Sequence, residues 1–156
     1  MDSIWLQTAP PPTFGSLRSD LKTDVLIIGG GMAGLLCAYR LAQAGVDYVL
    51  VEADRIGCGI TKNTTAKITL QHGLIYDKLI RKFGADRARL YLEANQTALE
   101  TYRALCRDID CGFEEKDAFV YSTDSRKKID RELKALDRLS FGAELANRLP
   151  LPFPVA

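Results

Sequence analysis

Three glycines near the N-terminus have the spacing of a backbone that a phosphate can approach closely. Residues 29–34 read GGGMAG and satisfy the pattern G-x-G-x-x-G. In that pattern the first glycine permits a tight turn, the second lets a diphosphate reach the main chain, and the third lets a helix pack against a sheet. These roles fall here to Gly29, Gly31 and Gly34. Alone the pattern is a weak signal, because glycine clusters also occur in ordinary turns.

The elements that must position this turn are present on both sides of it. Residues 25–28 are a continuous apolar run that ends in glycine, which is typical of a buried parallel strand. Residues 32–44 are rich in alanine and leucine and stop at Gly45, which predicts a helix with a glycine C-terminal cap. A second apolar run follows at 48–51. The order predicts a βαβ unit with a right-handed crossover.

An acidic residue, Glu52, stands at the end of the second predicted strand. In dinucleotide-binding folds a carboxylate at this place accepts hydrogen bonds from the adenosine ribose, and it repels a 2′-phosphate. The diphosphate itself would face the free amides and the positive dipole end of the helix that begins at Met32 and Ala33. The residues therefore predict a dinucleotide site that disfavours NADP, and they leave FAD and NAD as alternatives.

The segment that follows Glu52 resembles a known family. Residues 52–67 read EADRIGCGITKNTTAK. This is similar to the D-amino-acid oxidase-like flavoproteins, in which an acid is followed by an Arg-Ile-Gly-x-Gly-x-Ser/Thr stretch that runs along FAD. The wider chain is closest to a branch in which such a domain is fused to a C-terminal Rieske iron–sulfur domain. The stretches that carry this resemblance are 3–6, 64–67, 71–79 and 113–118.

The resemblance implies FAD as the cofactor and assigns places along it. The three motif glycines would face the diphosphate, Glu52 the ribose, and Arg55 the adenosine or a phosphate. Gly57, Gly59 and Thr61 would follow the cofactor, and residues 64–67 would lie nearest the flavin. The residues expected to contact FAD are Gly29, Gly31, Met32, Ala33, Gly34, Glu52, Ala53, Arg55, Gly59, Thr61, Thr64, Thr65, Ala66 and Lys67.

Several chemically capable side chains have two readings each. Lys67 could place a cation beside a reduced, anionic flavin, or it could be a solvated or phosphate-facing lysine. Cys58 could be a redox thiol or a flavin attachment point, but its flanking glycines favour a small residue chosen for space. His72 opens a predicted helix without a partner acid, so a structural or exposed role is favoured over a general base. No catalytic residue is assigned.

The remainder of the chain is expected to be mainly helical. Helices are predicted over 72–83, with Phe83 on the apolar side, and over about 86–110, with Tyr91 and Tyr102 on a core or interface stripe. A strand is predicted at 118–121. A further helix is predicted with Asp124 as its N-cap, and the charges over 126–138 are expected to form a solvated face. The alternating prolines over 149–156 favour an extended segment.

Composition excludes several classes of protein. The formal net charge of +1 gives no electrostatic reason to expect nucleic acid as the main partner. No apolar run approaches the roughly 18 residues that span a bilayer, and no secretion signal is visible, so we expect a cytoplasmic protein. The four cysteines include no C-x-x-C pair, which makes a metal centre improbable. They are expected to be ordinary reduced thiols.

The sequence therefore predicts an α/β, Rossmann-like βαβ unit followed by a mainly helical segment, and we expect the fold to be incomplete. The expected divisions are a leader over 1–23, the FAD-binding unit with its loop over 24–71, and a helical segment over 72–156. In the leader, Ile4 and Trp5 either dock on the body of a larger protein or belong to a loosely held terminus. The predicted function is the FAD-binding portion of an oxidoreductase that acts on an amine-like or other small donor. Its substrate domain, and a Rieske domain or other electron-transfer partner, would lie beyond residue 156. The alternative is a non-catalytic dinucleotide-binding or interaction module.

Overall fold

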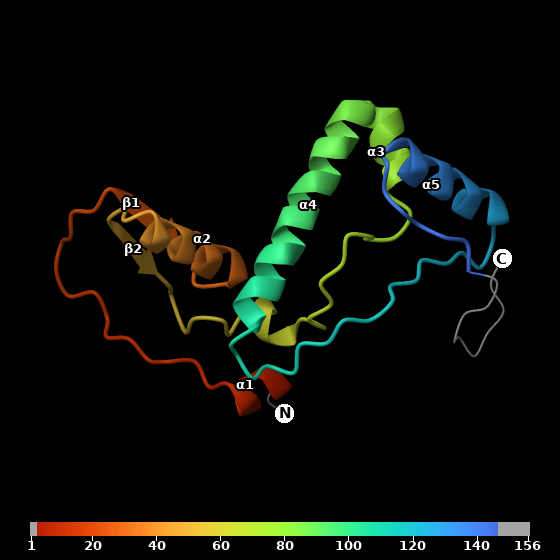
Figure 1. Ribbon diagram of the computed structural model, residues 1–156. Helices are drawn as coiled ribbons and strands as arrows, with labels where there is room; N and C mark the ends of the chain where they lie inside the picture. Colours follow the sequence, from red (N-terminus) through yellow and green to blue (C-terminus); the bar gives the residue numbers. More distant parts are fainter. Residues whose placement is uncertain (1–2, 147–156) are drawn as a thin grey trace. The chain divides into compact units, whose positions relative to one another are not determined.

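The computed structural model describes residues 3–146, and the chain forms two compact units, Met1–Lys67 and Ile68–Ala156 (Figure 1). Among the residues described, no helix is both long and apolar enough to cross a membrane. The elements of the first unit are α1 (Ile4–Thr8), β1 (Val25–Ile28), α2 (Met32–Gln43), β2 (Tyr48–Val51) and the 3-10 turn η1 (Ile60–Asn63). Those of the second are α3 (Tyr76–Phe83), α4 (Ala85–Cys106) and α5 (Arg126–Arg138).

The strand–helix–strand order predicted for the first unit is confirmed. Strands β1 and β2 pair in parallel, with Val25 opposite Tyr48 and Ile28 opposite Val51. Helix α2 packs on both strands, and Figure 1 shows it lying beside them. Helix α2 ends just before Gly45. This glycine has a φ of +66°, which a residue with a side chain rarely adopts and which stops the helix.

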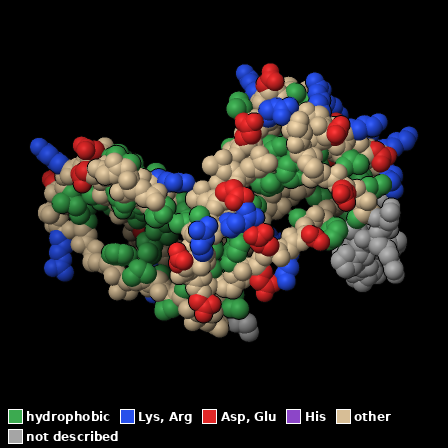
Figure 2. Space-filling model, in the orientation of Figure 1, with side chains coloured by type: hydrophobic (Ala, Val, Ile, Leu, Met, Phe, Trp, Pro, Cys, Tyr) green, Lys and Arg blue, Asp and Glu red, His purple; other side chains and the backbone are tan. Residues whose placement is uncertain are grey.

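The prediction that β1 is a fully buried strand is wrong. Only Ile27 is buried, whereas Leu26 is 56% exposed and Ile28 is 81% exposed. Successive side chains of a strand point to opposite faces of the sheet, and α2 covers the face that holds Ile27. Apolar side chains therefore reach the surface over this unit, where Figure 2 shows them in green.

The second unit has its own core at the junction of three helices. Helix α3 packs against both α4 and α5. The buried side chains there are Tyr76, Ala88, Leu92, Ala135, Leu136 and Leu139. Two helices that the periodicity predicts are present but shorter: Tyr76–Phe83 instead of 72–83, and Ala85–Cys106 instead of about 86–110. Leu92 rather than Tyr91 is the buried residue of its turn, and Tyr91 packs edge-on against the Tyr76 ring with centroids 6.3 Å apart.

Tyr76 is the centre of this core. Its side chain is fully buried, and its hydroxyl donates a hydrogen bond of 2.6 Å to the carbonyl of Leu70. Burial raises the pKa of Tyr76 to about 12, with smaller contributions from Tyr91 and Glu132. A phenol whose folded-state pKa lies above its ordinary value stabilises the fold below that ordinary value, and this stabilisation is lost as the pH rises from 10 toward 12.

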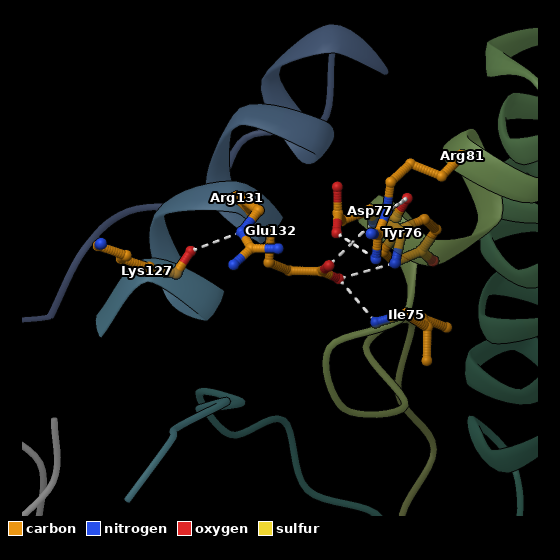
Figure 3. A network of polar contacts seen from close by, with 7 residues as sticks. All are labelled: Ile75, Tyr76, Asp77, Arg81, Lys127, Arg131 and Glu132. Carbon is orange, nitrogen blue, oxygen red and sulfur yellow. Dashed lines mark hydrogen bonds and ion pairs between the residues drawn. The ribbon is translucent and has the colours of Figure 1, made fainter. Parts of the chain in front are cut away.

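The expected solvated face of charges over 126–138 has one exception, Glu132, which is 4% exposed. Its carboxylate points from α5 to the first turn of α3 (Figure 3). One oxygen accepts from the amides of Ile75 and Tyr76 at 3.0 and 2.8 Å, and the other accepts from the amide of Asp77 at 3.0 Å. A helix N-terminus has unpaired amides and a positive dipole end, so this carboxylate caps α3 from another helix.

Three further local predictions are corrected. Residues 118–121 do not form a strand; no residue over 68–146 does, so this segment has no strand in its unit to pair with. Ser125 rather than Asp124 is the N-cap of α5, because the carboxylate of Asp124 pairs instead with Lys128 and with the hydroxyl of Ser122. Phe83 is 45% exposed rather than core. The extended segment expected over 149–156 lies outside the described residues.

Candidate cofactor-binding site

The turn from β1 into α2 is built from main-chain bonds. Gly29 has a φ of +105°, and its amide donates to the carbonyl of Val51 at 2.8 Å, which ties the turn to the end of β2. The carbonyl of Gly30 accepts from the amide of Gly57 at 2.8 Å. The loop after β2 is thereby fastened onto the glycine turn, because Gly30 and Gly57 meet although they are far apart in sequence.

The glycines of this turn are required for different reasons. A Cβ added at Gly34 would lie 2.0 Å from the carbonyl oxygen of Gly29, which no real structure tolerates. A Cβ at Gly30 would lie 2.7 Å from Cγ2 of Ile56. Gly29 meets nothing within 4 Å, but its positive φ favours glycine. The requirement at Gly30 was missed by the sequence analysis, because it depends on where Ile56 packs.

Gly31 differs from the other three. It is the N-cap of α2 with φ −78° and ψ −177°, an extended conformation that any residue adopts. A Cβ there would meet only Oγ1 of Thr61, at an ordinary contact distance of 3.6 Å. Neither packing nor backbone conformation within the chain therefore calls for glycine. The free space at this position fits a group that approaches the main chain from outside, as a diphosphate does at a helix N-terminus.

Glu52 lies beside the glycine turn and accepts main-chain hydrogen bonds from it and from the following loop. One carboxylate oxygen accepts from the amide of Gly30 at 2.7 Å, and the other accepts from the amide of Asp54 at 3.1 Å. The hydrogen bonds from Gly30 and then Asp54 lower the pKa of this exposed side chain. A carboxylate has about four acceptor positions, so those left over can accept from hydroxyl groups. The bond to Gly30 could not be read from the sequence.

The loop after Glu52 returns to the start of α2. Within η1, the hydroxyl of Thr61 accepts from the amide of Met32 at 3.1 Å and so lies against the first turn of the helix. Further along, Oγ1 of Thr64 accepts from the amide of Ala66 at 3.2 Å. Ala66 has a φ of +52°, a conformation in which glycine would be less strained.

The structure thus brings part of the predicted set together. Four of the predicted residues lie at or beside the first turn of α2 and are linked by the contacts given above: Gly31, Met32, Glu52 and Thr61. Ala33 lies in the same first turn with an exposed side chain. The other predicted residues that are exposed lie farther along the loop, and these are Ala53, Arg55, Thr65, Ala66 and Lys67. Gly59 is the N-cap of η1, and Cys58 is a half-buried free thiol.

Two residues of the leader also reach this loop. The hydroxyl of Ser3 donates to the carbonyl of Lys62, and the indole N–H of Trp5 donates to the carbonyl of Thr64 at 2.9 Å. Trp5 therefore contacts the loop of its own unit, whereas Ile4 is 62% exposed. Docking of these two residues on the body of a larger protein stays a prediction. The three prolines that follow gave no sign of this contact.

Over the described residues of the second unit, 68–146, no comparable glycine turn is present. A hollow of about 600 Å³ lies between α5 and the segments around 68–74 and 116–120. The carboxylate on its wall, Glu132, already caps α3. Over residues 3–146 no group of three or more His, Cys, Asp or Glu side chains could hold a metal ion. His72 is exposed and precedes α3 instead of opening it.

The chain is similar in sequence to known proteins. Residues 24–152 match the family described as FAD dependent oxidoreductase (DAO). The chain is 40% identical over 155 residues to the "Putative Rieske 2Fe-2S iron-sulfur protein YhfW" of Bacillus subtilis (strain 168), covering 97% of this chain and 30% of that protein. It is 30% identical over 117 residues to the gamma-glutamylputrescine oxidoreductase of Escherichia coli (strain K12), covering 72% of this chain and 27% of that protein.

A third relative, the p-hydroxybenzoate hydroxylase of Acinetobacter baylyi, is 33% identical over 82 residues, which are 48% of this chain and 20% of that protein. The chain thus spans less than a third of the length of each of these relatives. No solved structure matches. The resemblance to D-amino-acid oxidase-like flavoproteins, with FAD as cofactor, is confirmed by the family match. The chain belongs to the FAD-dependent oxidoreductase family.

Proposed function

We propose that residues 24–67 bind the ADP half of FAD in the N-terminal portion of a flavin-dependent oxidoreductase. The observation that carries this proposal is Gly31, a glycine at a helix N-terminus for which the chain itself has no need. A diphosphate placed there would receive hydrogen bonds from first-turn amides and would be attracted by the helix dipole. Glu52 would accept from the ribose hydroxyls with the acceptor positions that Gly30 and Asp54 leave over.

The loop residues have a second task in this proposal. The hydroxyl of Thr61 stands against the amide of Met32, so it lies beside the path that the diphosphate would take. The segment 64–67 would continue toward the flavin, with Lys67 as the cation nearest the ring. Bound FAD supplies a two-electron acceptor, and the residues of this chain hold its adenosine and diphosphate in place.

We also propose that the fold is completed by sequence outside these 156 residues. In a doubly wound sheet, a second layer of helices covers the face that β1 exposes here, where Ile28 is 81% accessible, and further strands extend the edges of the sheet. The chain spans only 30% and 27% of the length of the B. subtilis and E. coli relatives, which also supports completion of the fold by further sequence. The whole protein would oxidise an amine-like or other small donor, as the name of the E. coli relative suggests, and would pass electrons to a partner such as a Rieske domain, as the name of the B. subtilis relative suggests.

Replacing Gly31 with alanine tests the proposal. We expect the dissociation constant for FAD to rise at least tenfold, because the added methyl group stands where the diphosphate must approach the main chain. The fold should be unchanged, since the methyl group meets only Thr61 at 3.6 Å. The measurement is a titration with FAD followed by quenching of the tryptophan emission, which comes from Trp5 alone.

A matched control is Gly15→Ala, because a Cβ at this position would meet nothing within 4 Å and the position lies outside the site. It should leave the affinity unchanged. Equal affinities for the Gly31→Ala variant and the wild type would show that nothing approaches the main chain there. A wild-type chain that stays colourless with FAD and binds only ADP or NAD would favour the non-catalytic dinucleotide-binding module instead.

A further inference from the structure

The short helix α1 contacts the proposed cofactor loop through two directional hydrogen bonds. The hydroxyl of Ser3 donates to the carbonyl of Lys62, and the indole N–H of Trp5 donates to the carbonyl of Thr64 at 2.9 Å. In each case the two partners are 59 residues apart in sequence. Both acceptors are main-chain carbonyls, so the contact fixes the path of the loop backbone whatever its side chains are.

These bonds fix where α1 lies on the loop. Ile4 is 62% exposed, whereas Trp5 is 38% exposed, so the covered part of the indole ring adds apolar contact to its hydrogen bond. A helix of five residues is too short to be stable by itself in water. The same Ser3 side chain also accepts from the amide of Trp5 at 3.2 Å, which caps α1 and aligns the two donors.

The loop is held from its other side as well. Thr61 accepts from the amide of Met32 at the start of α2, and Gly57 donates to Gly30 in the glycine turn. The segment between Thr61 and Thr64 is therefore fastened between α2 and the leader. The next residues, up to Ala66 with its positive φ, leave this segment in a defined direction.

We infer that Ser3 and Trp5 are positioning residues that hold the loop 61–67 in the shape that receives FAD before FAD arrives. The inference rests on the proposed function, because it takes this loop to lie along the cofactor. A loop that is already ordered loses less conformational entropy on binding, so the leader increases affinity without touching the ligand. The glycine motif itself gives no sign that Ser3 and Trp5 have this role.

The variants that test the inference are Trp5→Phe, which keeps an aromatic ring but removes the N–H donor, and Ser3→Ala. In the chain without FAD, we expect amide hydrogen exchange over 62–67 to become faster in both. We expect the dissociation constant for FAD to rise roughly fivefold for each lost bond, measured by the fluorescence of the flavin itself. Ser3→Thr keeps the hydroxyl and should restore both values. Phe14→Leu changes a 75% exposed leader residue and should alter neither.

Two results would overturn the inference. One is exchange over 62–67 that is the same in Trp5→Phe and Ser3→Ala as in the wild type. The other is faster exchange with an unchanged affinity for FAD, which would make the contact structural only. A wild-type chain that binds no FAD contradicts the proposed function separately, and the exchange measured without FAD then still decides whether the leader holds the loop.

Discussion

Replacing Gly34 with alanine should cost unit Met1–Lys67 about 3 kcal/mol of unfolding free energy. Alanine inside a helix normally gains up to about 1 kcal/mol over glycine, so propensity alone predicts a small stabilisation. Here the new Cβ would lie 2.0 Å from the carbonyl oxygen of Gly29 and 3.4 Å from Cγ2 of Ile27. The first contact is with main chain that cannot turn aside, so α2 must move off the strands.

The measurement is urea unfolding followed by the emission of Trp5, which is the chain's one tryptophan and is bonded to the loop of this unit. Gly31→Ala is the matched control, because it is the same substitution three residues away without a close contact. It should change stability by less than about 0.5 kcal/mol. A Gly34→Ala variant as stable as the wild type would mean that α2 does not pack on β1 as closely as described.

Truncation of Glu132 to alanine should have a comparable effect on the helices of the second unit. The side chain accepts from three main-chain amides at the start of α3 and from the side-chain amide of Gln71 at 2.8 Å. A buried donor left without an acceptor costs about 1–3 kcal/mol, and water entering the space left behind would satisfy some of the four. We expect the free energy of unfolding of the second unit to fall by about 3 kcal/mol. The measurement is amide exchange, which should become faster at Ile75, Tyr76 and Asp77.

Two further variants separate capping from charge. Glu132→Gln keeps the size of the side chain and one acceptor oxygen. The free energy of unfolding of this variant should therefore lie between that of the wild type and that of the alanine variant. Asp137→Ala removes an exposed carboxylate from the same helix and should change exchange at α3 little. If Asp137→Ala matches Glu132→Ala, the effect comes from the charge or propensity of α5 and not from the cap.

Local pattern was sufficient to predict the βαβ unit. A run of four apolar residues, a helix of good helix formers and a glycine at Gly45 each act within a few residues, so their consequences can be read from a short window. The burial of β1 could not be predicted in the same way. The apolar run indicates that Leu26 and Ile28 are compatible with burial. Whether they are buried depends on another element packing on their face of the sheet, which the run itself does not reveal.

Long-range contacts explain what the sequence analysis missed at the site and in the core. Glu132 follows Ile129 by three residues and precedes Leu136 by four, so helical spacing places it on the apolar stripe, but only its closeness to the amides of α3 makes it a cap. Trp5 bonds to Thr64 across 59 residues, and no periodicity connects them. The strand predicted at 118–121 shows the converse: residues with high strand propensity do not form one without a partner.

The most direct test of the account is a comparison of ligands that share only part of FAD. The chain should bind FAD and also ADP, which should compete with FAD, because the proposed site consists of the helix N-terminus at Gly31 and of Glu52 as the proposed ribose acceptor. Riboflavin, which has no ADP half, should not compete. Competition by riboflavin but not by ADP, or no binding of either FAD or ADP, would contradict the claim that residues 24–67 hold the ADP half of FAD.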